Sequence, residues 1–310
     1  MELIKMSLAV QFSEYGTTEV LRVVDVPAPA PGPGQVRLAV RAAGVNPLDW
    51  KIMQGFMSQM MPLDLPAGLG YDIAGVVDQV GEGVTAFAVG DEVLGTSLTP
   101  AYAQSAVADA AALVTKPATV PWDVAGALAG SGGTAWTVLD RLKVTQGETL
   151  LIHAASGGVG TFTAQLAVAR GARVIGTASE SNHERLRSLG VLSVAYGERL
   201  ADRVREIAPE GVDAVLDASG RGEIPLSVEL AGGPERVLTL VAFDAASLGV
   251  QVHTDGASGN GVRALQDILP LIEEGRLHVP VWRTFPLAEA AAALDLSRAG
   301  HVGGKIVLLP

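Results

Sequence analysis

The sequence has no cysteine at any of its 310 positions. This absence excludes disulfide bonds, cysteine nucleophiles and every zinc site that is built on thiolates. Histidine is also scarce, and no two histidines stand four residues apart, the spacing that places two metal ligands on one face of a helix. The five histidines are His153, His183, His253, His278 and His301. We therefore expect no metal centre.

Positive charge is in short supply as well. The chain has 22 Lys and Arg residues against 33 Asp and Glu residues, which gives a net charge of -11. Such an acidic surface argues against nucleic acid or an anionic membrane as a partner. No apolar run reaches the roughly 18 residues that a membrane span requires, and the start, Met-Glu-Leu-Ile-Lys-Met, lacks the basic and apolar regions of a secretory signal. We expect a cytoplasmic protein.

The residues that are present favour large cores. Hydrophobic residues make up 48% of the chain, and this length is typical of about two domains. The first domain is predicted to be rich in β-strands, because short alternating runs are separated by glycine and proline. These runs are Leu8–Phe12, Leu21–Val26 and Gln35–Ala43. Residues 27–34 alternate proline with alanine or glycine, which predicts an extended connector rather than a central strand.

From Gly147 onward, predicted strands and helices alternate in the pattern of a doubly wound parallel sheet. The expected strands are 149–153, 172–177, 191–195, 212–217 and 236–241, with helices at 159–169, 182–189 and 199–208. Residues 122–142 have a helical tendency, which we expect the glycines within 129–135 to break. The tail is predicted to form helix 261–274, strand 278–284, helix 287–298 and strand 305–309. We thus predict an α/β fold with domains at 1–121 and 122–260, and a final segment, 261–310, that returns to the first domain.

A glycine-rich turn connects the first strand of the second domain to its helix. The strand, Thr149–His153, is followed by Ala-Ala-Ser-Gly-Gly-Val-Gly at 154–160. In such a βαβ unit, the backbone N–H groups of the turn and the helix N-terminus face a phosphate. Ala155 stands where the usual dinucleotide fingerprint has its first glycine, and glycine also serves ordinary turns. The flanking strand and helix nevertheless favour nucleotide binding over a merely structural turn.

Five stretches of the chain carry a family likeness. They are residues 44–51 (Gly-Val-Asn-Pro-Leu-Asp-Trp-Lys), 75–93, 133–136 (Gly-Thr-Ala-Trp), 154–160 and 304–308 (Gly-Lys-Ile-Val-Leu). In this order they resemble the zinc-independent, zeta-crystallin-like quinone oxidoreductases of the medium-chain dehydrogenase/reductase superfamily. The alanine at position 155 resembles the form usual in that branch. The zinc-containing branch carries Gly-His-Glu where this chain reads Gly70-Tyr71-Asp72.

The resemblance implies a GroES-like β-barrel domain, completed by the C-terminal tail, and a Rossmann domain, with cofactor and substrate in the cleft between them. It also implies a homodimer or homotetramer. We expect Asn46 to position the substrate or the nicotinamide ribose, although Asn-Pro is also a plain turn former. We expect Tyr71 to donate a hydrogen bond or to form a wall of the substrate site.

Cofactor binding is expected to involve three further groups of residues. The resemblance points to Thr134 and to Lys305, although Lys305 could equally be an exposed charge at the start of a strand. The glycine turn contributes Ser156, Gly157, Gly158 and Val159. The ends of two central strands contribute Ser219, Val241 and Phe243, since ligands bind at the carboxyl edge of such sheets.

The choice between NADPH and NADH depends on the residues that follow the second strand of the sheet. An acidic residue there would hold the ribose hydroxyls of NADH, but Ser179 occupies the nearest position, and a small hydroxyl leaves room for a 2′-phosphate. Donors or positive charge for that phosphate are expected from Asn182, His183 or Arg185, and the resemblance adds Tyr196. Glu180 is the dissenting residue, because it could hold the ribose instead. We favour NADPH.

The chemistry follows from the absence of a metal that could polarise a carbonyl. A quinone or an α,β-unsaturated carbonyl is already activated and can accept hydride with help from hydrogen-bond donors or water alone. We therefore predict NADPH-dependent reduction of quinones or enones. The competing hypotheses are a non-catalytic NADPH-binding redox sensor, and a zinc-free alcohol dehydrogenase or enoyl-thioester reductase.

Overall fold

The computed structural model describes residues 5–254, 260–300 and 302–310. The described residues form two compact units. Unit 1 contains the residues up to Gly130 together with those from Asn260 to the C-terminus, and unit 2 contains the residues from Ser131 to Thr254. Unit 1 is therefore assembled from two separate segments of chain. No helix of the described residues is long and apolar enough to cross a membrane.

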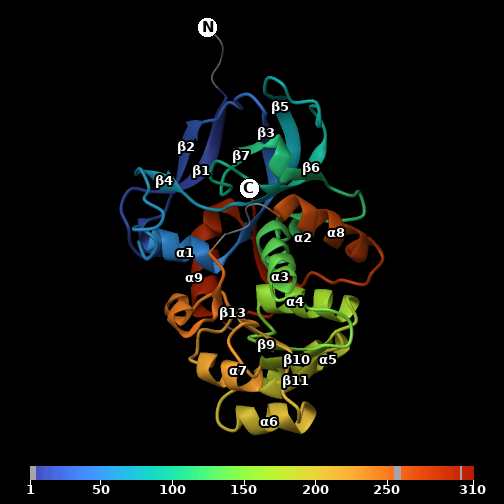
Figure 1. The fold of residues 1–310 in the computed structure, drawn as a ribbon. Helices are drawn as coiled ribbons and strands as arrows, with labels where there is room; N and C mark the ends of the chain where they lie inside the picture. Colours follow the sequence, from blue (N-terminus) through green and yellow to red (C-terminus); the bar gives the residue numbers. More distant parts are fainter. Residues whose placement is uncertain (1–4, 255–259, 301) are drawn as a thin grey trace. The chain divides into compact units, whose positions relative to one another are not determined.

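Unit 1 is built mainly from two β-sheets. Within its described residues, the larger sheet has the order β15-β16-β3-β5-β6-β8, with β7 also paired to β3, and the smaller has the order β2-β1-β4. The strands are β1 (Met6–Phe12), β2 (Arg22–Pro27), β3 (Gln35–Val45), β4 (Ala67–Gly68), β5 (Asp72–Val80), β6 (Glu92–Thr96), β7 (Ser105–Asp109), β8 (Leu113–Thr115), β15 (Val281–Pro286) and β16 (Lys305–Leu309). The helices are α1 (Pro47–Met53), α2 (Trp122–Gly126), α8 (Gly261–Glu273) and α9 (Ala290–Ala299) (Figure 1).

Strand β3 lies at the centre of unit 1. Its alternate residues Val36, Leu38 and Val40 are buried, as expected for a strand with one face on a core. It pairs antiparallel with β5, β7 and the C-terminal strand β16. The C-terminal segment thus completes the sheet of the first part of the chain.

The boundary between the units lies later in the chain than position 121, where we predicted it. The reason is helix α2, which packs on β3. Trp122 and Ala127 contact the small cluster that Ala42 and Val307 form in unit 1. The change to an alanine-rich composition at Pro121 therefore marks a helix that belongs to unit 1.

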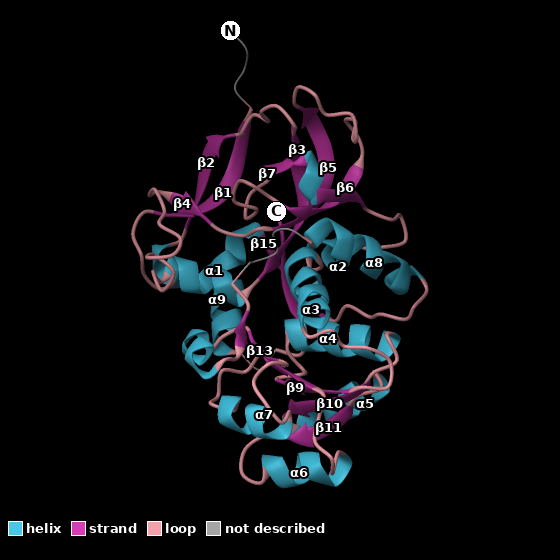
Figure 2. Cartoon of the chain, viewed as in Figure 1, coloured by secondary structure: helices cyan, strands magenta, loops and turns pink. Residues whose placement is uncertain are grey.

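Unit 2 is a doubly wound sheet, as predicted. Its described strands are parallel and have the order β11-β10-β9-β12-β13-β14. They are β9 (Thr149–His153), β10 (Arg173–Ala178), β11 (Leu192–Ala195), β12 (Ala214–Asp217), β13 (Val237–Thr239) and β14 (Gln251–Val252). The helices are α3 (Ala129–Arg141), α4 (Gly158–Ala169), α5 (His183–Ser188), α6 (Leu200–Ile207) and α7 (Ile224–Leu230). Helix α4 lies on one side of β9 and β10, and α6 and α7 lie on the other (Figure 2).

Three features of unit 2 differ from the sequence expectations. Helix α3 continues without a break through Gly130, Gly132 and Gly133, so the predicted interruption at 129–135 is wrong. Gly132 and Gly133 are buried, and a Cβ at Gly130 would lie 2.7 Å from the Asp72 carboxylate. The glycines thus permit close packing, and tertiary packing overrides their low helix propensity. The short elements α7 and β14 were not predicted.

Candidate functional site

The backbone of Asn46, at the N-terminus of α1, is held by Asp49, which in turn is bound by Tyr102. Asn46 follows β3 and adopts an extended backbone conformation. Its backbone N–H donates to Asp49 Oδ2 at 2.7 Å, three residues later, which is one half of a capping box. The same oxygen accepts the hydroxyl of Tyr102 at 2.7 Å. Asp49 therefore ties the start of the helix to a residue far along the chain.

The side-chain amide of Asn46 is fixed by two further partners. Lys305 Nζ, at the start of β16, donates to Asn46 Oδ1 at 2.6 Å. Because an ammonium group can only donate, the amide oxygen must face Lys305. The amide nitrogen donates to Asp72 Oδ2 at 3.0 Å, and Lys305 Nζ lies 3.7 Å from that oxygen. We call Asn46, Asp49, Asp72, Tyr102 and Lys305 the Asn46 cluster.

Burial controls the protonation of the Asn46 cluster. Desolvation raises the pKa of Asp49 to about 7, against the opposing effects of its Asn46 and Tyr102 hydrogen bonds. It also raises the pKa of Asp72 and lowers that of Lys305, although the attraction between these two groups opposes both shifts. Asp49 Oδ1 is buried and has no hydrogen-bond partner among the described residues. The cluster thus combines a buried cation with carboxyl groups that resist ionisation.

Tyr71 directly precedes Asp72 of the Asn46 cluster and lies close enough to Asp49 to be affected by its charge. Its side chain is half-buried, and burial together with the charge of Asp49 raises the pKa of its phenol. A tyrosine hydroxyl is already protonated at neutral pH with its ordinary pKa of about 10, and the upward shift acts in the same direction, so the hydroxyl can donate a hydrogen bond. Lys305, in contrast, is buried, so the expectation of an exposed strand-start charge is wrong.

The glycine turn of unit 2 has the geometry of a phosphate-binding turn. Ala154 has a left-handed backbone, with φ 59°, and its N–H donates to Thr177 Oγ1 at 3.1 Å. A Cβ at Gly160 would overlap the carbonyl oxygen of Ala154, so only glycine fits there. Gly157 caps α4 without a side-chain hydrogen bond. The first N–H groups of α4 therefore keep their donor capacity for a ligand.

The exposure of this turn agrees with that interpretation. Ser156, Gly157, Gly158 and Val159 are each half-buried, and the first turn of α4 has no acidic residue that would repel an anion. A Cβ at Gly157 would meet only the Ala154 oxygen, at 3.4 Å. The residues present thus fit the diphosphate of a dinucleotide.

The segment after β10 forms a small hydrogen-bonded group. Asn182 Nδ2 donates to Ser179 Oγ at 2.9 Å, and His183 Nε2 lies 3.3 Å from the carbonyl oxygen of Ala178. Arg185 points inward and donates to the Ser156 oxygen at 2.9 Å and to Asn182 Oδ1 at 3.2 Å. Arg185 therefore supports the glycine turn. Glu180 is exposed.

The ends of β12 and β13 are joined through one buried carboxylate. Asp217 Oδ1 accepts the N–H of Ser219 at 2.9 Å and lies 2.9 Å from its hydroxyl oxygen. Asp217 Oδ2 accepts Thr239 Oγ1 at 2.9 Å, and the same hydroxyl oxygen accepts the N–H of Val241 at 3.2 Å. Phe243 follows and is partly exposed. The loops that carry these candidate residues are therefore held rigidly at the strand ends.

Thr134, an expected cofactor residue, and His153 have less distinctive surroundings. Thr134 lies in α3 and is half-buried. His153 is fully buried and contacts Ser227 Oγ through Nε2 at 3.0 Å, and burial lowers its pKa. It is the last residue of β9 and packs within the core of unit 2.

Tyr102 is the member of the Asn46 cluster that the sequence does not single out. It stands 53 positions from Asp49, and no local pattern connects the two. Asp49 does have a local signal, because it stands three residues after Asn46, at the spacing of a capping box.

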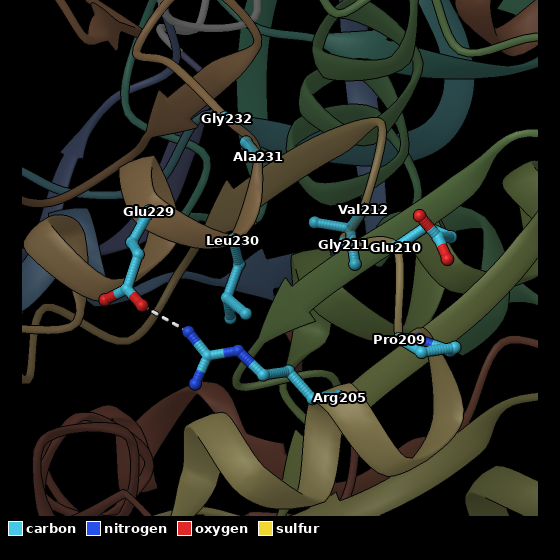
Figure 3. A pocket seen from close by; sticks show the side chains of 9 residues that line it. All are labelled: Arg205, Pro209, Glu210, Gly211, Val212, Glu229, Leu230, Ala231 and Gly232. Atoms are coloured by element: carbon cyan, nitrogen blue, oxygen red, sulfur yellow. Dashed lines mark hydrogen bonds and ion pairs between the residues drawn. The ribbon is translucent and has the colours of Figure 1, made fainter.

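Two hollows at the surface of unit 2 lie mostly away from the expected site residues. One, of about 260 Å³, is lined by Arg205, Pro209 and Gly211 among others. Figure 3 shows Arg205 of α6 reaching to Glu229 of α7, with which it forms an ion pair. A second hollow, of about 470 Å³, is lined by residues of α5, β11 and α6. Of the expected site residues only His183 lines either hollow, so neither defines the candidate site.

Comparisons with known proteins agree with one another. Residues 32–198 match the family model of the alcohol dehydrogenase GroES-like domain, and residues 189–308 match that of zinc-binding dehydrogenase. The chain is 34% identical to a quinone oxidoreductase of Pseudomonas aeruginosa, over 98% of this chain and 100% of that protein. It is 35% identical to a 2-haloacrylate reductase of a Burkholderia species, over 89% of this chain and 91% of that protein.

A solved structure extends the likeness to three dimensions. The Escherichia coli quinone oxidoreductase complexed with NADPH superposes with a TM-score of 0.88 at 26% identity, over 98% of this chain and 100% of that one.

Proposed function

The chain belongs to the quinone oxidoreductase, zeta-crystallin-like branch of the medium-chain dehydrogenase/reductase superfamily, and from this premise we propose its activity. It is an NADPH-dependent oxidoreductase that transfers hydride to quinones or α,β-unsaturated carbonyls without zinc. The observation that carries the proposal is the glycine turn after β9, where the first N–H groups of α4 have no side-chain cap. Two similar proteins support the substrate class, since one is named a quinone oxidoreductase and the other a 2-haloacrylate reductase.

The cofactor would be held by unit 2. The diphosphate would lie on Ser156, Gly157, Gly158 and Val159, where backbone N–H groups and the helix dipole favour an anion. Thr134, Ser219, Val241 and Phe243 complete the proposed cofactor residues, together with Lys305. The similar Escherichia coli enzyme is complexed with NADPH, which supports this cofactor for the present chain.

Preference for NADPH over NADH rests on the end of β10. Ser179 is the first residue after that strand and carries only a small hydroxyl. The exposed Glu180 forms the start of a short 3-10 helix. We propose that Ser179, Asn182, His183 and Tyr196 surround the 2′-phosphate.

Zinc does not fit the residues of the Asn46 cluster. Among the described residues, no group of three or more His, Cys, Asp or Glu side chains is arranged to hold a metal ion. Asp72 already faces the ammonium of Lys305, and the chain has no cysteine. We therefore propose a reaction in which the bound nicotinamide supplies hydride and the protein supplies orientation and hydrogen bonds.

Asn46 and Tyr71 are the residues that we propose to contact the reacting molecules. The Asn46 amide is held by Lys305 and Asp72, and one N–H of its amide nitrogen remains for a ligand after the bond to Asp72. Tyr71 stays protonated and can donate to an oxygen on which negative charge develops. We propose that the amide N–H of Asn46 and the hydroxyl of Tyr71 bind the enolate or phenolate oxygen of the substrate.

A substrate panel tests the proposal. Purified protein should oxidise NADPH in the presence of quinones, alkenals or haloacrylates, faster than it oxidises NADH. Binding of NADPH without oxidation by any acceptor would refute the enzyme and favour a non-catalytic redox sensor. Turnover confined to alcohols would instead favour a zinc-free alcohol dehydrogenase, and turnover confined to enoyl thioesters would favour an enoyl-thioester reductase.

Four further expectations belong to the same proposal. A small-molecule quinone or enone is the substrate, and nucleic acid is not a partner. The protein forms a homodimer or homotetramer, which sedimentation analysis would test. It acts in the cytoplasm.

A further inference from the structure

One contact in unit 2 joins two loops that follow distant strands. The guanidinium of Arg221 stacks on the ring of Tyr196, with 4.6 Å between its central carbon and the ring centroid. Arg221 belongs to the loop after β12, residues 218–223, which we call the β12 loop, and Tyr196 directly follows β11. Because the strands of this sheet are parallel, both loops lie at its carboxyl edge.

The order of the strands shows which strand ends this contact crosses. Strand β11 is separated from β12 by β10 and β9. Neighbouring strands are about 4.8 Å apart, so the two loops start roughly 14 Å from each other. The Arg221–Tyr196 stack therefore spans the ends of β10 and β9. These are the strand ends that carry Ser179 and the glycine turn.

The backbone beneath Arg221 is anchored. Its N–H lies 3.2 Å from Ser219 Oγ and 3.1 Å from Glu223 Oε2. Ser219 Oγ donates to Glu223 at 2.6 Å and is also within 2.9 Å of Asp217. Hydrogen bonds thus hold the β12 loop at the end of its strand, and they fix the backbone from which the Arg221 side chain extends.

Three other arginines of unit 2, Arg185, Arg199 and Arg203, are occupied by other partners. Arg185 donates to the carbonyl oxygen of Ser156 and to Asn182. Arg199 pairs with Asp202, and Arg203 donates to backbone carbonyls at the end of β11. Arg221, within the part of the chain that the structure describes, forms no ion pair with a carboxylate. Its charge remains available at the strand ends, where the proposed 2′-phosphate needs a cation.

We propose that Arg221, braced by the Tyr196 ring, is the cation that binds the 2′-phosphate of NADPH and sets the preference for NADPH over NADH. The inference rests on the proposed function, since it assigns a residue to that cofactor site. An arginine suits the role because its planar group can stack on a ring and still donate two parallel hydrogen bonds to a phosphate. From the sequence we expect Asn182, His183 or Arg185 in that role, but Arg185 is turned inward.

Binding measurements without turnover test the assignment. Dissociation constants would be measured by calorimetry for NADPH, NADH, 2′,5′-ADP and 5′-AMP. Loss of a charge-assisted phosphate contact should weaken the binding of NADPH and 2′,5′-ADP to Arg221→Ala by about 10-fold to 100-fold. Affinity for NADH and 5′-AMP should change by less than about threefold, which also shows that the variant is folded.

Four companion variants refine the test. Arg199→Ala removes an exposed arginine of a neighbouring loop that is already paired, and it should leave the NADPH to NADH ratio unchanged. Arg221→Lys should retain part of the preference because the charge stays. Tyr196→Phe keeps the ring and should retain most of the preference, whereas Tyr196→Ala should lose much of it.

The outcomes separate this inference from the proposed function. If Arg221→Ala keeps the preference of the wild type for NADPH, the assignment is overturned while NADPH-dependent reduction stands. Equal affinity of the wild type for 5′-AMP and 2′,5′-ADP would overturn the assignment too, because the protein would then have no site for the 2′-phosphate. A preference abolished by Arg221→Ala in a protein that reduces no acceptor supports the assignment and refutes the proposed enzyme.

Discussion

Replacing Asp49 by asparagine tests the electrostatics of the Asn46 cluster. Burial raises the pKa of Asp49 from 3.8 to about 7. Because the folded-state pKa is the higher one, the folded protein binds an extra proton between these values. The resulting stabilisation is complete below about pH 4 and is lost as the pH rises through 7. Asp49 should therefore make the folded protein less stable at pH 8 than at pH 5.

The size of this effect follows from the two pKa values. Proton linkage for one group with these values gives a difference of about 3 kcal/mol in unfolding free energy between pH 5 and pH 8. For a domain of 150–250 residues that corresponds to a shift in Tm of roughly 6 to 12 °C. Asparagine cannot ionise, and its amide oxygen can still accept the N–H of Asn46 and the hydroxyl of Tyr102.

The assay compares thermal unfolding of the wild type and Asp49→Asn from pH 5 to pH 8. The wild type should lose stability relative to the variant as the pH rises, while Asp25→Asn, an exposed carboxylate of the same unit, should follow the wild type. Parallel pH profiles for the wild type and Asp49→Asn would refute the reasoning. Asp49 would then ionise in the folded state as easily as in the unfolded chain.

The remaining predictions concern the same two units. Lys305→Met leaves the buried Asp72 without its cation and should lower the free energy of unfolding, measured in urea, by about 3–5 kcal/mol. Adding Asp72→Asn should restore part of this loss, and an unchanged urea midpoint of unfolding in Lys305→Met would contradict the ion pair. Gly160→Ala places a methyl group on a carbonyl oxygen of the glycine turn and should weaken NADPH binding at least 10-fold. Gly261→Ala, at the start of α8, adds a methyl group in open space and should leave NADPH binding unchanged; equal effects would argue against the turn geometry. Asn46→Ala should lower kcat about 10-fold or more with little change in NADPH affinity. A kcat equal to that of the wild type in stopped-flow assays would show that Asn46 does not position the reacting molecules.

The fold could be predicted from the sequence wherever a long pattern repeats. Strand Thr149–His153 and its glycine turn are located closely by the sequence, because an apolar run, a turn and a helical period follow one another within a few residues. The break predicted at 129–135 is wrong for the opposite reason. Glycine lowers helix propensity locally, but burial against the carboxylate of Asp72 favours it there.

The candidate site divides in the same way. Asn46 and Asp49 have a signal within four residues, since the carboxylate accepts the N–H of the residue that precedes the helix. The contact of Tyr102 with Asp49, and that of Lys305 with Asn46, join residues that are 53 and 259 positions apart in the sequence. Long-range pairing has no local sequence signal, so the partners and the burial of these groups required the structure.

The position of Lys305 on the last strand has a consequence for folding during synthesis. Unit 2 is continuous in sequence, so it can fold as soon as its own residues have left the ribosome. Unit 1 must wait, because β16 pairs with β3 and brings Lys305 to Asp72 only when residues 305–309 have emerged. A chain that ends before Lys305 should therefore show unit 2 resistant to limited proteolysis and unit 1 sensitive, so that an incomplete chain never acquires the Asn46 cluster.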